Sequence, residues 1–210
     1  MATPLNRAAH FLPSRAEQAG GGLTVQRLST EELAARDQYP FWNEAVCDVF
    51  VGLDCSRSTD GPFFGTVLRR SVEIEPGEST SFISVASEPQ NAVRSPRHIR
   101  RAADAWIMLV VQTSGPAVLR QDGHSAVLGP GDMVLFDSTR PYAFDFDRPF
   151  RQLVMKIPHR RMAARLPLPA LWLGRPVMAS SPLGKVLAAH VSAVSAALET
   201  IDPAVRPGLI

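Results

Sequence analysis

The sequence predicts an α+β fold that is mainly β: a small antiparallel barrel with a helix before it and helices after it. Residues 123–146 hold short apolar runs separated by a Gly/Pro/Asp turn at 129–132 and a polar break at 137–139. Runs of this kind around tight turns are typical of antiparallel strands. Apolar residues at helical spacing occur before residue 54 and again after residue 157. Together these observations predict a jelly-roll barrel of the cupin type, flanked by helices at both ends.

The composition predicts a globular cytoplasmic protein. The 210 residues are 45% hydrophobic and 20% charged, and the net charge of +2 does not indicate a nucleic-acid surface. No apolar run is long enough to cross a membrane, and the N-terminus lacks the apolar core of a signal peptide. The cysteines Cys47 and Cys55 fit free thiols in a reduced cytoplasm. We therefore expect no membrane partner.

The first part of the chain predicts a flexible lead, a short strand and a helix. Residues 1–22 end in three glycines and are expected to form the lead. A short strand is expected at 23–28, and a helix-start signature predicts a short helix over 31–37. The first strong helix is predicted at Pro40–Leu53, with the proline in its first turn.

The helix Pro40–Leu53 carries one apolar face. That face consists of Trp42, Ala45, Val46, Val49, Phe50 and Leu53. This spacing favours a helix that packs on a sheet and closes the core. The alternative places Trp42 or Phe50 at the rim of a ligand pocket.

About eight short strands are predicted after residue 63. They are expected at 64–75, 80–87, 102–113, 117–120, 125–128, 133–136, 142–146 and 150–157. Residues Pro89–Ser95 are interpreted as a loop and Pro96–Arg101 as a basic strand or loop. The barrel with its preceding helix thus occupies residues 23–157.

Residues 158–210 predict a helical dimerisation segment. A short basic helix begins at Pro158, and a long helix Pro182–Thr200 begins after the N-cap Ser181. An apolar stripe with small flanking residues suits close packing on a second helix. The candidate dimerisation residues are Leu183, Leu187, Val191, Val194 and Leu198. We predict a homodimer through this helix.

The sequence predicts neither a metal nor a catalytic site. The five histidines form no H-x-H pair, and iron or manganese needs several nitrogen and oxygen ligands that converge. There is no G-x-S-x-G elbow and no phosphate-binding glycine loop. The carboxylates between 132 and 147 are interpreted as turn and strand-end groups. We therefore expect no enzyme and no cofactor.

Because no catalytic or metal site is expected, the remaining candidate function is the binding of a small ligand. In the strand Trp106–Gln112, alternate side chains face opposite ways, so one set lines the lumen and the other packs under helices. The candidate ligand contacts are Trp106, Met108, Val110, Gln112, Phe136, Tyr142, His98 and Arg97. Each polar one is more often a surface or hydrogen-bonded structural residue. A cationic or aromatic anchor in an apolar lumen suits a small organic acid or aromatic compound.

Four segments in order resemble a known family. They are Phe41–Ala45 with Phe50–Asp54, Asp122–Asp132, Asp137–Tyr142 (D-S-x-R-P-Y) and Phe150–Pro158. This set resembles the effector-binding and dimerisation domain of AraC/XylS-type bacterial transcription regulators. The resemblance implies a cytoplasmic regulator whose barrel binds a small inducer, whose C-terminal helices pair two subunits, and whose separate helix-turn-helix domain binds promoter DNA. Here the sequence departs, since no recognition-helix pattern follows Thr200, and we expect the DNA-binding domain to be absent.

The sequence is compatible with three functions. The first is a ligand-sensing, dimerising regulator domain, the second a small cupin enzyme with or without a metal, and the third a barrel kept only for dimerisation. An open lumen of a few hundred cubic ångströms favours sensing, whereas a lumen packed solid favours dimerisation alone.

Overall fold

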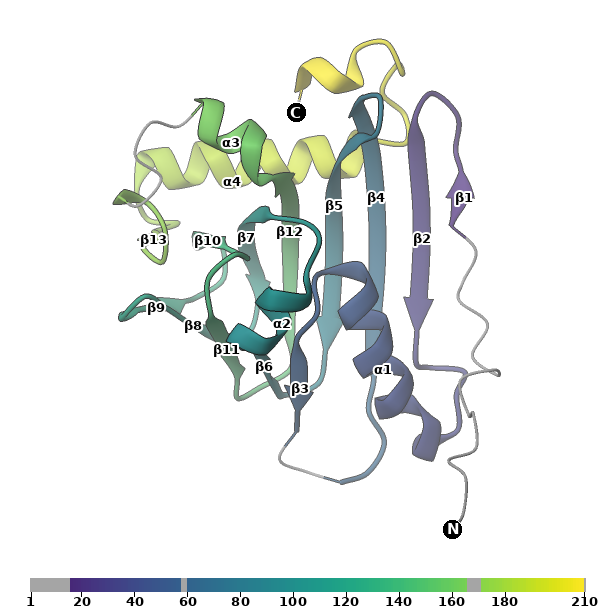
Figure 1. Cartoon of the computed structure of the whole chain (residues 1–210), viewed down its shortest axis with the longest axis vertical. Coiled ribbons are helices and arrows are strands. Elements are labelled where there is room, and N and C mark those ends of the chain that lie inside the picture. The colour runs from purple at the N-terminus through teal and green to yellow at the C-terminus, as the bar shows by residue number, and fades with distance from the viewer. Residues whose placement is uncertain (1–15, 58–59, 166–170, 210) are drawn as a thin grey trace.

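Two antiparallel sheets lie face to face in the computed structural model, which describes residues 16–57, 60–165 and 171–209 (Figure 1). The larger sheet has the spatial order β1 (Glu17–Gln18), β2 (Leu23–Ser29), β4 (Gly65–Glu75), β5 (Glu78–Ser87), β12 (Phe150–Pro158), β7 (Trp106–Ser114), β10 (Met133–Asp137) and β13 (Pro176–Val177). The smaller sheet has the order β3 (Asp54–Ser56), β6 (Gln90–Arg94), β11 (Tyr142–Phe146), β8 (Ala117–Gln121) and β9 (His124–Leu128). The predicted mainly β, cupin-like architecture is confirmed as an open pair of sheets rather than a closed ring of strands.

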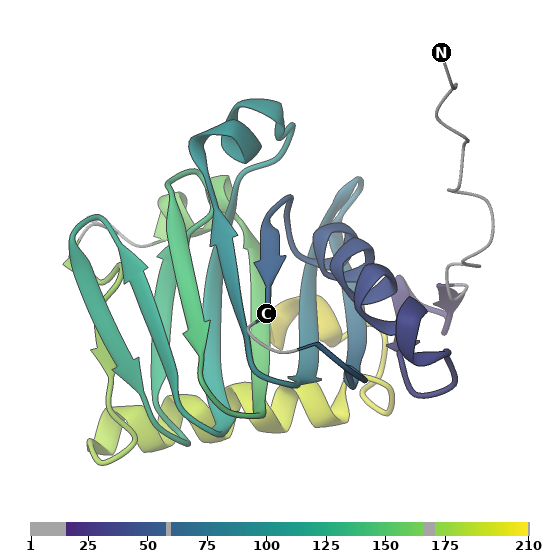
Figure 2. The ribbon, with the colours of Figure 1, turned by 90° about the horizontal axis from the view of Figure 1, so that it is seen from below.

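Two of the helices cover opposite faces of the larger sheet (Figures 1 and 2). The helices of the chain are α1 (Ala35–Val49), α2 (Pro96–Arg101), α3 (His159–Arg165) and α4 (Pro182–Ala197), and a short 3-10 helix η2 (Arg206–Leu209) follows. Helix α1 lies on the same face as the smaller sheet, whereas α4 crosses the other face (Figure 2). Within the described ranges no helix is both long and apolar enough to span a membrane.

Two apolar cores result from this layering. The first lies between the sheets and under α1, and includes Trp42, Met108 and Phe136. The second lies between the larger sheet and α4, and includes Val111, Val191 and Leu198. The predicted division of strand β7 into a lumen face and a helix-covered face is therefore confirmed.

The two predicted N-terminal helices are one helix. The structure has α1 beginning at Ala35, so Pro40 lies inside it rather than in its first turn, and 31–34 is a turn. Buried Gln38 explains the earlier start. Its amide nitrogen donates to the carbonyls of Thr30 (3.2 Å) and Leu33 (3.3 Å), and its oxygen accepts from Phe63 N (2.7 Å).

The segment 89–101 also differs from its prediction. The predicted loop contains strand β6, and the predicted basic strand or loop is helix α2. Strand β6 was missed because its buried side chains are Gln90 and Arg94 rather than apolar residues. Helix α2 begins at Pro96 after the N-cap Ser95, which is the same signature that was recognised correctly at Ser181.

The last part of the predicted flexible lead is paired. Glu17 and Gln18 lie opposite Val25 and Thr24 of β2, so β1 forms one edge of the larger sheet. Residues 1–15, the rest of the predicted lead, lie outside the described residues.

Candidate functional site: the interior between the sheets

A small cavity lies between the two sheets, and α1 forms one of its walls. Trp42, Val46 and Phe50 reach it from α1 and its C-terminal end, while Val110 and Val154 reach it from the larger sheet. Its volume is about 60 Å³. Ligand pockets usually measure roughly 300–1,000 Å³. The structure therefore lacks the open lumen of a few hundred cubic ångströms that favours sensing, because side chains fill most of the interior.

Aromatic rings fill much of that interior. Phe136 meets Tyr142 edge to face, with 4.7 Å between the ring centroids. Phe144 stacks on Phe146 at 5.5 Å, and Phe146 stacks on Phe150 at 3.6 Å. These rings come from β10, β11 and β12, so both sheets contribute to a surface that suits a flat apolar ligand.

Four of the eight predicted ligand contacts line the cavity. These are Met108, Val110, Phe136 and Tyr142. Burial raises the pKa of the Tyr142 hydroxyl, which keeps it neutral.

The other four predicted contacts lie elsewhere. Gln112 is buried beside the cavity, where its amide nitrogen donates to the carbonyls of Ser114 (2.9 Å) and Gly115 (3.0 Å). Trp106 lies half-buried against the core. Arg97 is exposed on α2. His98 caps α2, since its Nδ1 accepts from Ser95 N (3.2 Å), and its Nε2 lies 3.4 Å from Asp54 Oδ1.

Two buried cations that sequence reasoning missed lie on the inward faces of the sheets, each paired with a residue that lines the cavity, although neither lines the cavity itself. Lys156 on β12 is 6% exposed and Arg94 on β6 is 1% exposed. The Lys156 Nζ donates to Phe50 O (2.5 Å) and lies 4.5 Å from the centre of the Trp106 ring. Arg94 Nη1 donates to Gly52 O, and its Nε donates to Ser138 O (2.7 Å). Both cations thus hold the chain at the C-terminal end of α1.

Burial lowers the pKa of both cations. Burial, with a further contribution from Arg69, lowers the pKa of Lys156 to about 8, although Asp104 and Asp48 oppose this shift. Burial also lowers the pKa of Arg94. None of the ion pairs found within residues 16–57, 60–165 and 171–209 includes Lys156, Arg94 or Arg69. Within these residues no carboxylate is in direct contact with the three cations, and Asp104 and Asp48 act on Lys156 only from a longer distance.

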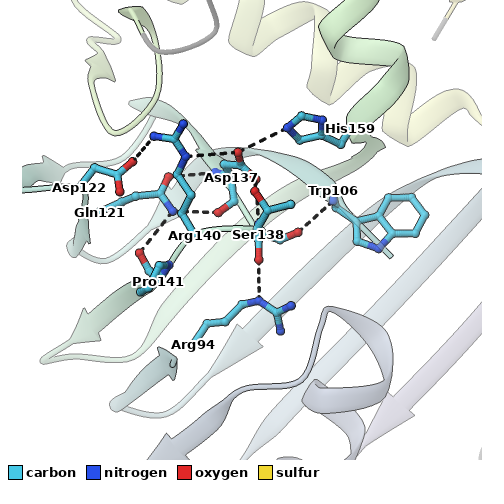
Figure 3. Close-up of polar contacts among 10 residues, drawn as sticks. Arg94, Trp106, Gln121, Asp122, Asp137, Ser138, Arg140, Pro141 and His159 are labelled. Carbon is cyan, nitrogen blue, oxygen red and sulfur yellow. Dashed lines mark hydrogen bonds and ion pairs between the residues drawn. The ribbon is translucent and has the colours of Figure 1, made fainter. Parts of the chain in front are cut away.

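The D-S-x-R-P-Y segment is a scaffold at the end of this interior (Figure 3). Asp137 Oδ1 accepts from Thr139 N (2.8 Å), and its Oδ2 lies 3.4 Å from His159 Nε2 on α3. Ser138 Oγ accepts from Trp106 N (2.9 Å), while Ser138 O binds Arg94. The motif thus joins β10 to α3, β7 and β6, and it positions Arg94 rather than lining the cavity itself, except through Tyr142.

The described part of the chain offers no site for a metal ion, and its Cys55 thiol is unsuited to nucleophilic chemistry. No group of three or more His, Cys, Asp or Glu side chains there could hold a metal ion. Cys47 and Cys55 are free and half-buried, and burial raises the pKa of the Cys55 thiol to about 12. A thiol with such a pKa is a poor nucleophile at neutral pH.

Comparisons with known proteins agree with this geometry. Residues 42–210 match the model of the AraC-binding-like domain family. A Bacillus sp. (strain OxB-1) protein described as an uncharacterized protein in the nit 5′ region is 34% identical over 137 residues, covering 65% of this chain and 51% of that protein. The transcriptional activator NphR of Rhodococcus sp. is 31% identical over 84 residues, covering 40% of this chain and 25% of that protein. The match thus spans about half the length of the first relative and a quarter of the second.

A solved structure shows the same fold. The AraC-like transcriptional activator CuxR superposes with a TM-score of 0.69 over 88% of this chain and 65% of that chain, at 17% sequence identity. At this identity the likeness concerns the fold alone.

Proposed function

We propose, from the premise that this chain belongs to the AraC-binding-like domain family, that it is the ligand-sensing and dimerising part of a cytoplasmic transcription regulator. A small organic effector binds between the sheets and controls DNA binding by a helix-turn-helix domain outside the residues described. The activator among its relatives supports a regulatory rather than a catalytic role.

The observation that carries this proposal is the aromatic cavity walled by α1. Binding sites are concave and mostly apolar, with a few polar groups that orient the ligand. Here Phe136, Phe144 and Phe146 supply the apolar surface. Tyr142 and Gln152 supply polar groups at its edge.

The cavity must enlarge to admit an effector, and α1 is the wall that moves in this proposal. Its buried side chains enter the core from one side, and α1 forms no part of either sheet. At its C-terminal end, Lys156 and Arg94 contact backbone carbonyls. Displacement of α1 changes the outer surface of the domain, which provides a signal to the rest of the regulator.

Dimerisation is proposed through the outward face of α4. The predicted stripe divides in two: Leu183 (57% exposed) and Leu187 (39% exposed) face solvent, whereas Val191, Val194 and Leu198 are buried in their own chain. Val186, at 67% exposure, extends the exposed apolar face. Apolar residues grouped at helical spacing on a surface are typical of a protein interface.

A thermal-shift screen with aromatic acids, amides, aldehydes and sugars tests the sensing proposal. We expect at least one compound to raise the Tm of the wild type and of Val127→Phe, which adds a ring at an exposed position of β9. The same compound is expected not to stabilise Val110→Phe, which fills the cavity. Equal stabilisation of all three proteins would contradict binding between the sheets.

The cavity volume of about 60 Å³ favours a second candidate, a domain retained for dimerisation alone. In that case no compound of the screen raises the Tm, while charged substitutions on the outward face of α4 still convert a dimer to a monomer.

A further inference from the structure

We propose that the effector is an aromatic carboxylate, with its ring in the aromatic cavity and its carboxylate bound by Lys156 and Arg94. This inference rests on the proposed function, because it names the class of ligand that the same interior selects.

The first support is the placement of the two cations beside the cavity. Lys156 pairs directly with Met108, and Arg94 pairs directly with Tyr142. Side chains of directly paired residues in antiparallel strands lie on the same face of the sheet. Met108 and Tyr142 both line the cavity, so Lys156 on the larger sheet and Arg94 on the smaller one face the same interior, next to the lining residues rather than among them.

The second support is a mismatch of charge. The partners of both cations are backbone carbonyls, and those at a helix C-terminus carry only about half an elementary charge. Two full positive charges therefore face a much smaller negative one in a buried setting. Asp104 and Asp48 act on Lys156 from exposed positions, but Arg69 adds a further positive charge. A buried charge without a counterion is costly, so an anion is the ligand that this end of the interior favours.

The third support is the apolar surface next to the cations. The Lys156 ammonium lies over the Trp106 ring, and Phe136 and Tyr142 follow within the same interior. A bare inorganic anion gains nothing from these rings. A ligand with a flat apolar body and one carboxylate matches both parts of the site, because the ring stacks while the carboxylate accepts hydrogen bonds from two cations.

The backbone carbonyls that Lys156 and Arg94 contact connect binding of the carboxylate to the position of α1. A carboxylate that binds Lys156 and Arg94 replaces Phe50 O and Gly52 O as their acceptor. The C-terminal end of α1 then loses its contacts with both sheets at this point. Binding of the anion and outward movement of α1 are thus one event.

Titration of tryptophan fluorescence with benzoate and with its neutral analogue benzamide tests the inference. We expect benzoate to bind the wild type about tenfold more tightly or better, since charge-assisted hydrogen bonds are stronger than those of a neutral amide. Lys156→Met removes the ammonium but keeps the length of the side chain, and it should reduce the preference severalfold, because only Arg94 then remains to bind the carboxylate. Lys185→Met is the matched control, because Lys185 is exposed on α4, and it should retain the preference.

A second measurement applies even if Lys156→Met fails to fold. The wild type should lose affinity for benzoate as the pH rises through about 8, where Lys156 becomes neutral, while its affinity for benzamide stays constant. Arg69, Arg94, Asp48 and Asp104 are the other charged groups that act on Lys156.

The outcomes separate the two proposals. Equal binding of benzoate and benzamide, each blocked by Val110→Phe, would overturn the carboxylate inference and leave the sensing function standing. No binding of either probe at millimolar concentration would count against the sensing function and the inference together.

Discussion

The side chain of Gln121 satisfies both backbone hydrogen-bonding groups of Asp137. Its Nε2 donates to Asp137 O (2.8 Å), and its Oε1 accepts from Asp137 N (2.9 Å). Gln121 belongs to the smaller sheet and Asp137 to the larger one, so this pair of bonds ties the two sheets together (Figure 3). Both residues are 3% exposed.

Loss of this tie should destabilise the domain. Gln121→Leu leaves the buried N–H of Asp137 without this partner, at a cost of about 1–3 kcal/mol, and leaves its C=O with only the longer hydrogen bond from Arg140 N (3.3 Å). We expect the free energy of unfolding to fall by about 2 kcal/mol or more in chemical denaturation. The control Gln18→Leu lies on the exposed strand β1 and should change stability little. Equal stability of the two variants would show that other contacts join the sheets.

Gly65 and Trp42 give a second prediction. A methyl group on Gly65 would lie 2.4 Å from Cε3 of Trp42, whose indole is 1% exposed. Gly65→Ala should therefore displace the ring, at a cost of about 1–3 kcal/mol. Because Trp42 lines the cavity, its fluorescence should change as well. Gly123→Ala is a poor control, since Gly123 has a positive φ of 77°, whereas Gly208→Ala meets no neighbour and should leave both measurements unchanged.

The two faces of α4 should respond differently to charge. Leu183→Glu combined with Val186→Glu alters only the exposed face, so we expect a monomer in light scattering with a native circular dichroism spectrum. Val191→Glu places a carboxylate in the core under α4 and should lower the free energy of unfolding by about 3 kcal/mol or more. A dimer mass that survives the double substitution would refute this interface.

Lys156 gives a prediction on stability and pH. Its pKa is about 8 in the folded protein, against an ordinary value of 10.5. Between these pH values the unfolded chain holds the proton and the folded protein does not, so stability rises with pH in this window. We expect the wild type to gain stability relative to Lys156→Met from pH 8 to pH 10.5, measured by urea denaturation. Cysteine and tyrosine titrations affect both proteins alike and cancel in the comparison. A difference that is constant with pH would mean that Lys156 keeps an ordinary pKa.

Much of the fold follows from local pattern. The alternation in β7 was enough to separate the cavity face, with Met108 and Val110, from the face under α4. Strand β6 was not recognised because its inward positions are polar, and their burial depends on partners far along the chain, such as Gly52 and Ser138.

The candidate site could be predicted only in part. Lys156 was within reach of sequence reasoning, since it lies at the same parity as Gln152 and Val154 on β12, both of which line the cavity. The size of the cavity was not, because it depends on how rings such as Phe146 and Phe150 stack across strands. The charge of Arg97 and His98 favours them as anchors for an acid, but both lie on helix α2 and neither lines the cavity.

The central claim is that a small organic ligand binds between the two sheets. The most direct test is a set of intermolecular nuclear Overhauser effects between benzoate ring protons and the protein. Binding between the sheets predicts contacts with the Trp42 indole N–H and with the rings of Phe136 and Phe146, which line the cavity. Contacts confined to exposed groups, such as the ring of Trp172, would contradict it.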